Sequence, residues 1–359
     1  MNQAVQVVVQ ETSEIKTETS AKPWYMNTKA TDLLFIIFMP VISFLIVALI
    51  CEPRAKNGAF LYGKETPYWF AIGATMLTHM HVLLVFTRSH MNMSVFKRYK
   101  FRFTLIPLLA LAAMWVSPLV FGIMSAIGLY WDEWHSLMQT FGFGRIYDTR
   151  AGNPAAIGRK RDMIFCFIIG FLPALVLLTY LPKGESPGEM ANFLEISTIN
   201  AARFGGVIEA VRWPLILFGI GYSLWYFWSY YQLAKSGYKV SKAKIALFAT
   251  TGLSTIATAS LFTVADGIFF GNIYHAIQYV FIVMISERSN LATLTGLKQK
   301  SYTGVYLIYF LVIIPFMFVL AGLRQMTAQW EYLAAFWLLT SLLHFWFDGF
   351  IWSVRRQDI

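Results

Sequence analysis

The stretch IFFGNIYHAIQYVFIVMIS, residues 268–286, contains no Asp, Glu, Lys or Arg. As an α-helix that rises about 1.5 Å per residue, it is long enough to cross the roughly 30 Å hydrocarbon core of a bilayer. Further apolar stretches of similar length cover residues 32–51, 67–87, 103–129, 162–181, 213–234, 245–265, 303–322 and 330–353. The chain is 57% hydrophobic and 13% charged, whereas soluble domains have about 45–50% and 25%. We therefore expect an all-α, polytopic integral membrane protein rather than a soluble globule.

A tenth stretch, residues 130–146, is shorter and more polar, so the charges of the loops must decide whether it crosses. Lys and Arg concentrate in the cytoplasmic loops of membrane proteins. The basic segments are 88–102, 145–161, 235–244, 286–300 and Arg355–Arg356, and the mixed or acidic ones are 52–66, 182–212 and 323–329. These assignments all agree only if residues 130–146 cross. The sequence thus predicts about ten transmembrane helices with both termini cytoplasmic.

The predicted helices form a single transmembrane helical domain over residues 32–354. The polar segment before them lacks the features of a secretory signal, so we expect residues 1–31 to form a disordered cytoplasmic tail. Residues 188–210 are too polar to span and are expected to form an amphipathic segment on the outer surface. The expected location is the bacterial inner (cytoplasmic) membrane.

The formal net charge of +10 does not indicate a nucleic acid partner, because the basic residues gather in short loops and orient the chain in the bilayer. The expected partners are the lipid bilayer and a lipid-soluble small molecule, and the oligomeric state stays open. The two cysteines, Cys51 and Cys166, fall near opposite faces of the membrane, so no disulfide is expected.

The histidines give the strongest indication of function, because most of them lie inside predicted spans, where ionisable side chains are costly and usually functional. Those inside the spans are His79, His81, His135, His275 and His344. The second, fourth, eighth and tenth helices carry them, and all four run from the outer to the inner side. Several imidazoles can therefore reach a similar depth and point at one metal ion. His79 and His81 lie about 200° apart around a helix, so one of them should point elsewhere.

Polar residues follow three of these histidines at helical spacing and share their helix face. They are Gln139, Gln278, Tyr279 and Asp348. Each could ligate the metal or accept the second imidazole proton and so fix the tautomer. His90 falls in or near a basic loop and is left out of the site. No catalytic residue is assigned.

Imidazole-rich ligation suits iron, copper or zinc better than hard ions, and the chain has no glycine-rich phosphate loop. The leading hypothesis is a membrane-embedded metalloenzyme, a non-haem iron oxygenase or oxidase acting on a lipid-soluble substrate. One alternative is a b-type haem electron-transfer protein, since histidines at one depth also suit axial ligation of haem. Another is a transporter or receptor with an intramembrane polar path through His135, Gln139, Gln278 and Asp348.

Three blocks of the sequence carry a resemblance. They are WHSLMQTFGFGRIYDTR (134–150), YHAIQYVFIV (274–283) and HFWFDGFIWSVRR (344–356). With their WHxxxQ, YHxxQY and HFxxDGxxW patterns they resemble blocks of an uncharacterised family of bacterial polytopic membrane proteins, over most of the chain. In general architecture alone, the chain is also similar to the Brp/Blh-type carotenoid-cleaving dioxygenases, in which membrane-embedded histidines hold a non-haem iron. That similarity implies an iron site and a lipid-soluble substrate.

Overall fold

The computed structural model describes residues 23–57, 67–180, 201–294, 296 and 331–351, and throughout these residues it contains helices and no strand. In chain order the helices are α2 (Lys29–Asp32), the π-helix η1 (Leu33–Ile37), α3 (Met39–Ile50), α4 (Arg54–Asn57), α5 (Tyr68–Ser89), α6 (Met93–Val116), α7 (Pro118–Arg150), α8 (Arg159–Gly170), α9 (Leu172–Leu178), α11 (Ala201–Lys235), α12 (Lys242–Leu261), α13 (Val264–Ser286), α14 (Arg288–Leu294) and α16 (Glu331–Ile351). The all-α prediction is confirmed for this part of the chain.

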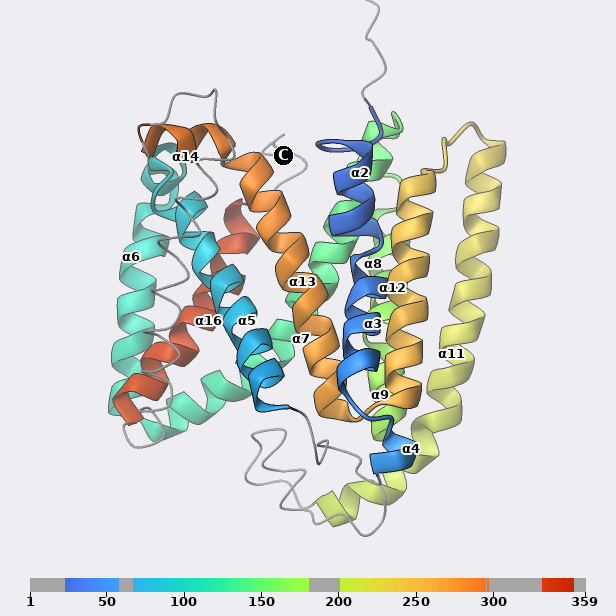
Figure 1. Cartoon of the computed structure of the whole chain (residues 1–359), viewed down its shortest axis with the longest axis horizontal. Coiled ribbons are helices and arrows are strands. Elements are labelled where there is room, and N and C mark those ends of the chain that lie inside the picture. Colours follow the sequence, from blue (N-terminus) through green and yellow to red (C-terminus); the bar gives the residue numbers. More distant parts are fainter. Residues whose placement is uncertain (1–22, 58–66, 181–200, 295, 297–330, 352–359) are drawn as a thin grey trace, which may run out of the picture.

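Several of these helices have the length and composition of membrane spans. Five qualify outright: α6, the α8 to α9 stretch Arg159–Leu178, α12, α13 and the Ala334–Ile351 part of α16. The bent pair Lys29–Ile37 and Met39–Lys56, which turns by 51°, makes a sixth if it is one span. The chain is therefore a membrane protein, as its composition predicts. The helices α5, α7, α11, α13 and α16 share one direction, and α3, α6, α8 and α12 run in the opposite direction (Figure 1).

The folded part of the chain begins earlier than predicted, because part of the expected tail is ordered. Arg150 donates hydrogen bonds to the backbone oxygens of Pro23 and Tyr25 at 3.2 and 2.8 Å. Asp32 is fully buried, and its carboxylate accepts a hydrogen bond from the backbone N–H of Met26 at 2.8 Å. A buried carboxylate needs such donors, so residues 23–31 are held against α7 and the assignment of 1–31 as a disordered tail is corrected for them.

Other predictions fall partly outside the described residues. These include the tail before residue 23, the segment 188–200 and the span 303–322. Residues 201–210 of the predicted surface segment form the first part of α11.

Helix α7 corrects the predicted boundary between the third and fourth spans. The spans 103–129 and 130–146 place the break near residue 130, but α6 ends at Val116 and α7 continues from Pro118 to Arg150. The real boundary is a capping signal: the Ser117 hydroxyl accepts a hydrogen bond from the N–H of Val120 at 3.3 Å, and proline suits the first helical turn. The 33 residues of α7 extend for about 50 Å. The helix accordingly crosses the bundle obliquely (Figure 1).

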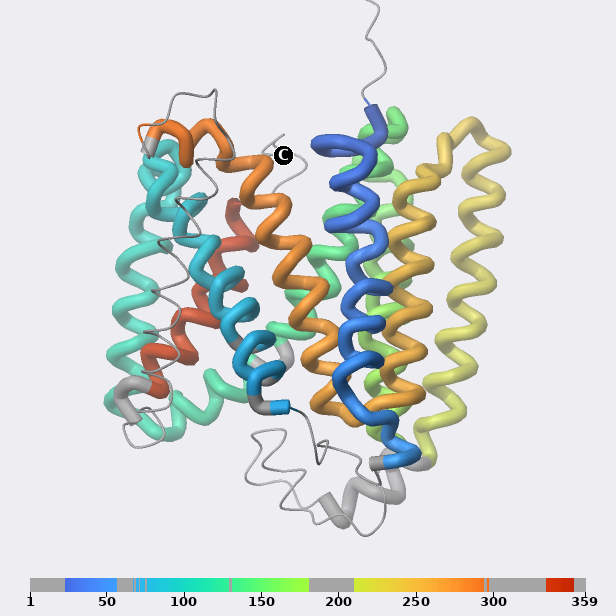
Figure 2. The backbone as a smooth tube through the Cα atoms, viewed as in Figure 1, coloured from blue at the N-terminus to red at the C-terminus, as the bar shows by residue number. Residues whose placement is uncertain are grey.

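Helix α13 lies in the middle of the bundle, with α5 on one side and α3 on the other (Figure 2). One cluster of buried apolar side chains joins it to α5, α6 and α16, and another joins it to α3 and α5. A third cluster lies mainly among α7, α8, α11 and α12. There Gly144 of α7 allows a close approach, since a Cβ atom at this position would lie 2.6 Å from Cζ of Phe248.

A buried charge network joins α7, α8, α11 and α12. It consists of Arg145, Asp148, Asp162, Lys244, Tyr226 and Tyr230. Arg145 donates to Asp148 at 2.7 Å and to Asp162 at 2.5 Å. Lys244 lies 2.7 Å from Asp148, and both tyrosines donate to Asp162. Two cations and two anions balance, so the network connects four helices without leaving a net buried charge.

Replacing Lys244 by methionine is expected to destabilise the protein strongly, because it leaves two buried carboxylates beside one cation. Breaking a buried ion pair on one side costs about 3–5 kcal/mol. Thermal unfolding in detergent should show a much lower midpoint for Lys244→Met than for Lys242→Met, since Lys242 is exposed two residues away. Equal midpoints for the two variants would show that the network contributes little.

Candidate metal centre

Four histidines from four helices meet inside the bundle. They are His81 on α5, His135 on α7, His275 on α13 and His344 on α16. The side chain of His135 is 11% exposed, and the other three residues are at most 2% exposed. Because the four helices run in the same direction (Figure 1), these positions reach one level of the bundle. The structure thus brings together four of the five histidines that the sequence singled out.

The four rings contact one another mostly edge to face. The ring centroid of His81 lies 4.9 Å from that of His275 and 4.7 Å from that of His344. His135 lies 5.1 and 4.7 Å from the same two rings, which are themselves 6.4 Å apart. The ligand atoms of His81, His275 and His344 are within 4.8 Å of one another, as are those of His135, His344 and Asp348. Two groups of potential ligands therefore share His344.

The ring nitrogens of the cluster lack the partners that buried polar atoms normally have. Neither nitrogen of His81, His275 or His344 makes a hydrogen bond with a described residue, and the same holds for Nε2 of His135. Most buried polar atoms in proteins are paired, and leaving one unpaired costs about 1–3 kcal/mol. Such a set of unpaired nitrogens is typical of a site that binds a further group.

Asp348 lies at the edge of the histidine cluster and is almost buried. Its Oδ2 atom is 3.5 Å from Nε2 of His135 and 3.8 Å from Nε2 of His344. Its Oδ1 atom accepts a hydrogen bond from the hydroxyl of Tyr279 at 2.8 Å. Two of the predicted companions, Asp348 and Tyr279, thus lie where they can orient two of the histidines.

The other two predicted companions, Gln139 and Gln278, form hydrogen bonds with each other and with backbone oxygens instead of with the histidine rings. Gln278 donates to the backbone oxygen of Ile36 at 2.9 Å, and Gln139 donates to Oε1 of Gln278 at 3.1 Å and to the backbone oxygen of His275 at 3.0 Å. The Ile36 oxygen needs an outside donor because residue 40 is proline and has no N–H to offer it. The glutamines therefore connect α7 and α13 to the bent first span. Pro40 is the sequence signal that indicates this orphan oxygen.

The remaining histidines of the described residues lie away from the cluster. The ring of His79 stacks on Trp337 with the centroids 4.3 Å apart, which fits its position on a different face of α5 from His81. His90 follows the end of α5 and is hydrogen-bonded at both ring nitrogens. Partial burial lowers the pKa of His90.

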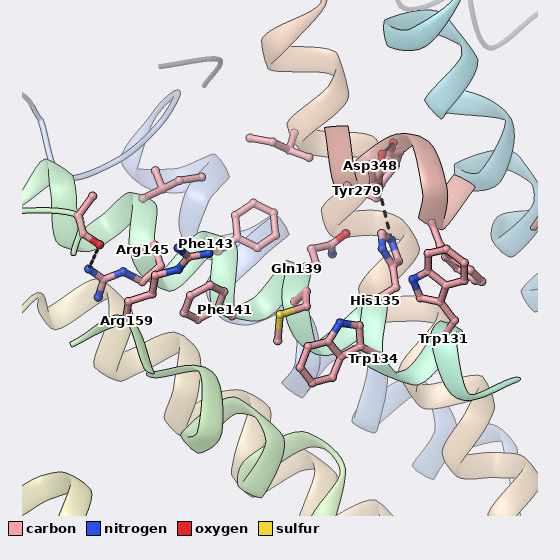
Figure 3. Close-up of a pocket in the computed structure, with 17 residues that line it drawn as sticks. Trp131, Trp134, His135, Gln139, Phe141, Phe143, Arg145, Arg159, Tyr279 and Asp348 are labelled. Carbon is pink, nitrogen blue, oxygen red and sulfur yellow. Dashed lines mark hydrogen bonds and ion pairs between the residues drawn. The ribbon is translucent and has the colours of Figure 1, made fainter. Parts of the chain in front are cut away.

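A cavity of about 430 Å³ lies beside the cluster (Figure 3). His135 and Asp348 are at one end of it, and Arg145 and Arg159 are at the other. Between them the wall is mainly apolar and aromatic, with Trp134, Met138, Phe141, Phe143, Ile146 and Phe345 among its residues. This volume lies within the usual range for small-molecule sites. The basic composition of residues 145–161 predicts only a cytoplasmic loop, whereas Arg145 and Arg159 lie in the wall of this cavity.

The donor atoms of the site are imidazole nitrogens, one carboxylate and one phenol. Such a set can bind a transition metal, and the phenol and carboxylate can hold or pass a proton next to it. Neither a protein-family model, nor a curated protein, nor a solved structure matches this chain.

Asp348→Asn is expected to weaken metal binding by about 10–100-fold, because it removes the anionic acceptor beside His135 and His344. The variant should still fold, since the asparagine oxygen can accept the hydrogen bond of Tyr279. Fe²⁺ and Zn²⁺ titrated into chelator-treated protein would measure the change, with the thermal midpoint as control for folding. Unchanged affinity in a folded variant would exclude a role for this carboxylate.

Proposed function

We propose that this chain is a membrane-embedded metalloenzyme, a non-haem iron oxygenase or oxidase that acts on a lipid-soluble substrate. His81, His135, His275 and His344 hold the metal, and Asp348 and Tyr279 support them. The observation that carries the proposal is the convergence of four imidazoles, seven of whose eight ring nitrogens are buried without a hydrogen-bond partner among the described residues.

Structural packing alone explains this convergence poorly. Histidines between membrane helices usually form interhelical hydrogen bonds, whereas the rings of this cluster contact one another and leave their nitrogens unused. A bound metal satisfies such nitrogens at about 2.0–2.1 Å each. The ligand atoms of His81, His275 and His344 already lie within 4.8 Å of one another, and His135 belongs to the second group, which shares His344.

Iron is the first choice among the metals that imidazole favours, with copper and zinc as the alternatives. Bound at this site, iron would supply electron-transfer and O₂ chemistry that no side chain provides. The protein's own contribution is to orient the imidazoles and to exclude water. Asp348 would accept a proton from Tyr279 or from an imidazole, because its two oxygens face both.

A lipid-soluble substrate fits the position of the cavity. Its wall between the two polar ends is largely apolar and aromatic, and Trp134 on that wall is 45% exposed. The exposed side of a helix inside a bilayer faces lipid, so a substrate dissolved in the membrane can enter from the side.

The packing of the four rings argues against haem. Axial ligation places a flat macrocycle between two histidines, but both His81 and His135 lie within about 5 Å of the pair His275 and His344. The transport alternative requires Gln139 and Gln278 to line a polar path. Both side chains are instead hydrogen-bonded to each other and to backbone oxygens, which argues against this alternative.

The topology is part of the same proposal: about ten transmembrane helices, including residues 303–322, with both termini in the cytoplasm and the bacterial inner membrane as the location. The support is the basic composition of the loops at the end of the bundle where α5, α7 and α13 finish. A C-terminal green fluorescent protein fusion should fluoresce, and alkaline phosphatase at the same position should be inactive. The opposite pair of results would reverse the orientation.

Alanine at His81, His135, His275 or His344 is expected to remove most of the bound metal, because each variant takes one ligand from the site. Elemental analysis of detergent-purified protein would measure this, with His79→Ala and His90→Ala as controls that keep the metal. The proposal fails if the wild type retains less than about a tenth of an equivalent of any transition metal after reconstitution. A Soret band in the optical spectrum would favour the haem alternative instead.

A further inference from the structure

The cavity beside the histidine cluster follows one face of α7. Its wall includes Trp131, Trp134, His135, Met138, Gln139, Gly142, Arg145 and Ile146 of that helix, whose spacing of three or four residues is that of one helix face. Phe141 and Phe143, on either side of Gly142, line it as well. Ten residues separate His135 from Arg145, a distance of about 15 Å along the helix axis. The cavity is therefore elongated, with the candidate metal centre near one end.

The far end of the cavity carries two guanidinium groups, and only one of them is neutralised. Arg145 donates to Asp148 and Asp162 and to the backbone oxygens of Ala155 and Ile157. Arg159 makes no ion pair or hydrogen bond with any residue in the described ranges. The end of the cavity opposite the histidines thus has an excess of positive charge.

From this polarity we propose that the substrate is an amphiphile with a long apolar chain and one anionic group, a carboxylate or a phosphate. Arg159 binds the anionic group, and the chain lies along α7 between Met138, Phe143 and Ile146. The reaction part of this statement rests on the proposed function, but the binding part does not require the metal.

The length of the cavity limits the length of the chain. An extended chain covers roughly 3.5 Å for every three bonds, so about a dozen bonds span the roughly 15 Å between the levels of His135 and Arg145 on α7. Short-chain acids would leave the apolar wall unfilled, whereas chains of roughly 12 to 16 carbon atoms fill it. Charge alone does not select the ligand, because the apolar wall contributes through burial of each CH₂ group.

Arg159 has a simpler alternative role, which is to extend toward the surface and attract phospholipid head groups of the bilayer. Lys and Arg near helix ends commonly do so. In that case, neutralising Arg159 would have the same effect as neutralising a neighbouring basic residue, and neither change would alter ligand binding in the cavity. Arg159 and Lys160 are both exposed, but only Arg159 lines the cavity, so Lys160 provides the matched comparison.

The first test measures binding of tritiated palmitate to the detergent-purified full chain. Arg159→Gln should weaken binding about tenfold or more, as expected for loss of a charge-assisted hydrogen bond, while Lys160→Gln should change it less than about twofold. On the wild-type protein, hexadecyl phosphate should compete with palmitate for binding, whereas the uncharged hexadecanol should compete poorly. No binding to the wild type, or equal loss in both variants, would overturn the proposal.

A second variant tests the cavity without changing charge. A Cβ atom at Gly142 meets no atom within 4 Å, so Gly142→Leu is expected to fold, fill the cavity and abolish palmitate binding. Gly122→Leu is its control, because Gly122 on the same helix also has open space and lies outside the cavity. Retained binding in Gly142→Leu would place the ligand elsewhere and refute the assignment.

Metal analysis of the same preparations separates the two proposals. Arg159→Gln and Gly142→Leu should keep the metal content of the wild type, since neither residue is a ligand. If the wild type binds no metal but palmitate binding depends on Arg159, the metalloenzyme proposal is wrong and the amphiphile proposal is supported. If metal is bound and palmitate binding is insensitive to Arg159, the amphiphile proposal fails alone.

Discussion

The free energy needed to remove polar groups from water is the main constraint on the interior of this bundle. Inside a bilayer no solvent can replace a missing partner, so every buried donor, acceptor or charge must find one within the protein or its ligands. The charge network around Asp162 meets most of this requirement, with two cations, two anions and two tyrosines in contact. The Ile36 oxygen meets it through Gln278. Single unpaired polar atoms occur elsewhere among the described residues, but the histidine cluster gathers seven unpaired ring nitrogens at one place.

That contrast explains why the two polar regions of the bundle have different roles. In the charge network each cation is paired with an anion, so the network acts mainly to connect helices. The cluster of four imidazoles is unsaturated and has a cavity beside it. A site that holds a reactive group needs both properties, unused donor atoms and space for a second molecule, and they coincide at one end of the cavity.

Much of the fold was accessible from the sequence because hydropathy and histidine spacing depend on local composition. The apolar runs identify a helical membrane protein, and the 200° between His79 and His81 predicts that only one of them joins the cluster; the structure selects His81. The boundary at Ser117 was missed because capping depends on a single side chain rather than on average polarity. The role of Gln278 was missed because its partner oxygen is 242 residues away in the chain, and no helical periodicity can reveal a contact of that kind.

One structural feature, the link between Arg145 and the backbone oxygens of Ala155 and Ile157, has a consequence for regioselectivity. It fastens the start of α8, and with it Arg159, to the same rigid helix that carries His135. The backbone position of Arg159 relative to the histidine cluster is therefore fixed. In the proposed enzyme, a substrate whose anionic group binds Arg159 would present to the metal a carbon atom chosen by its distance from the head group, so chains of different length would react at the same position.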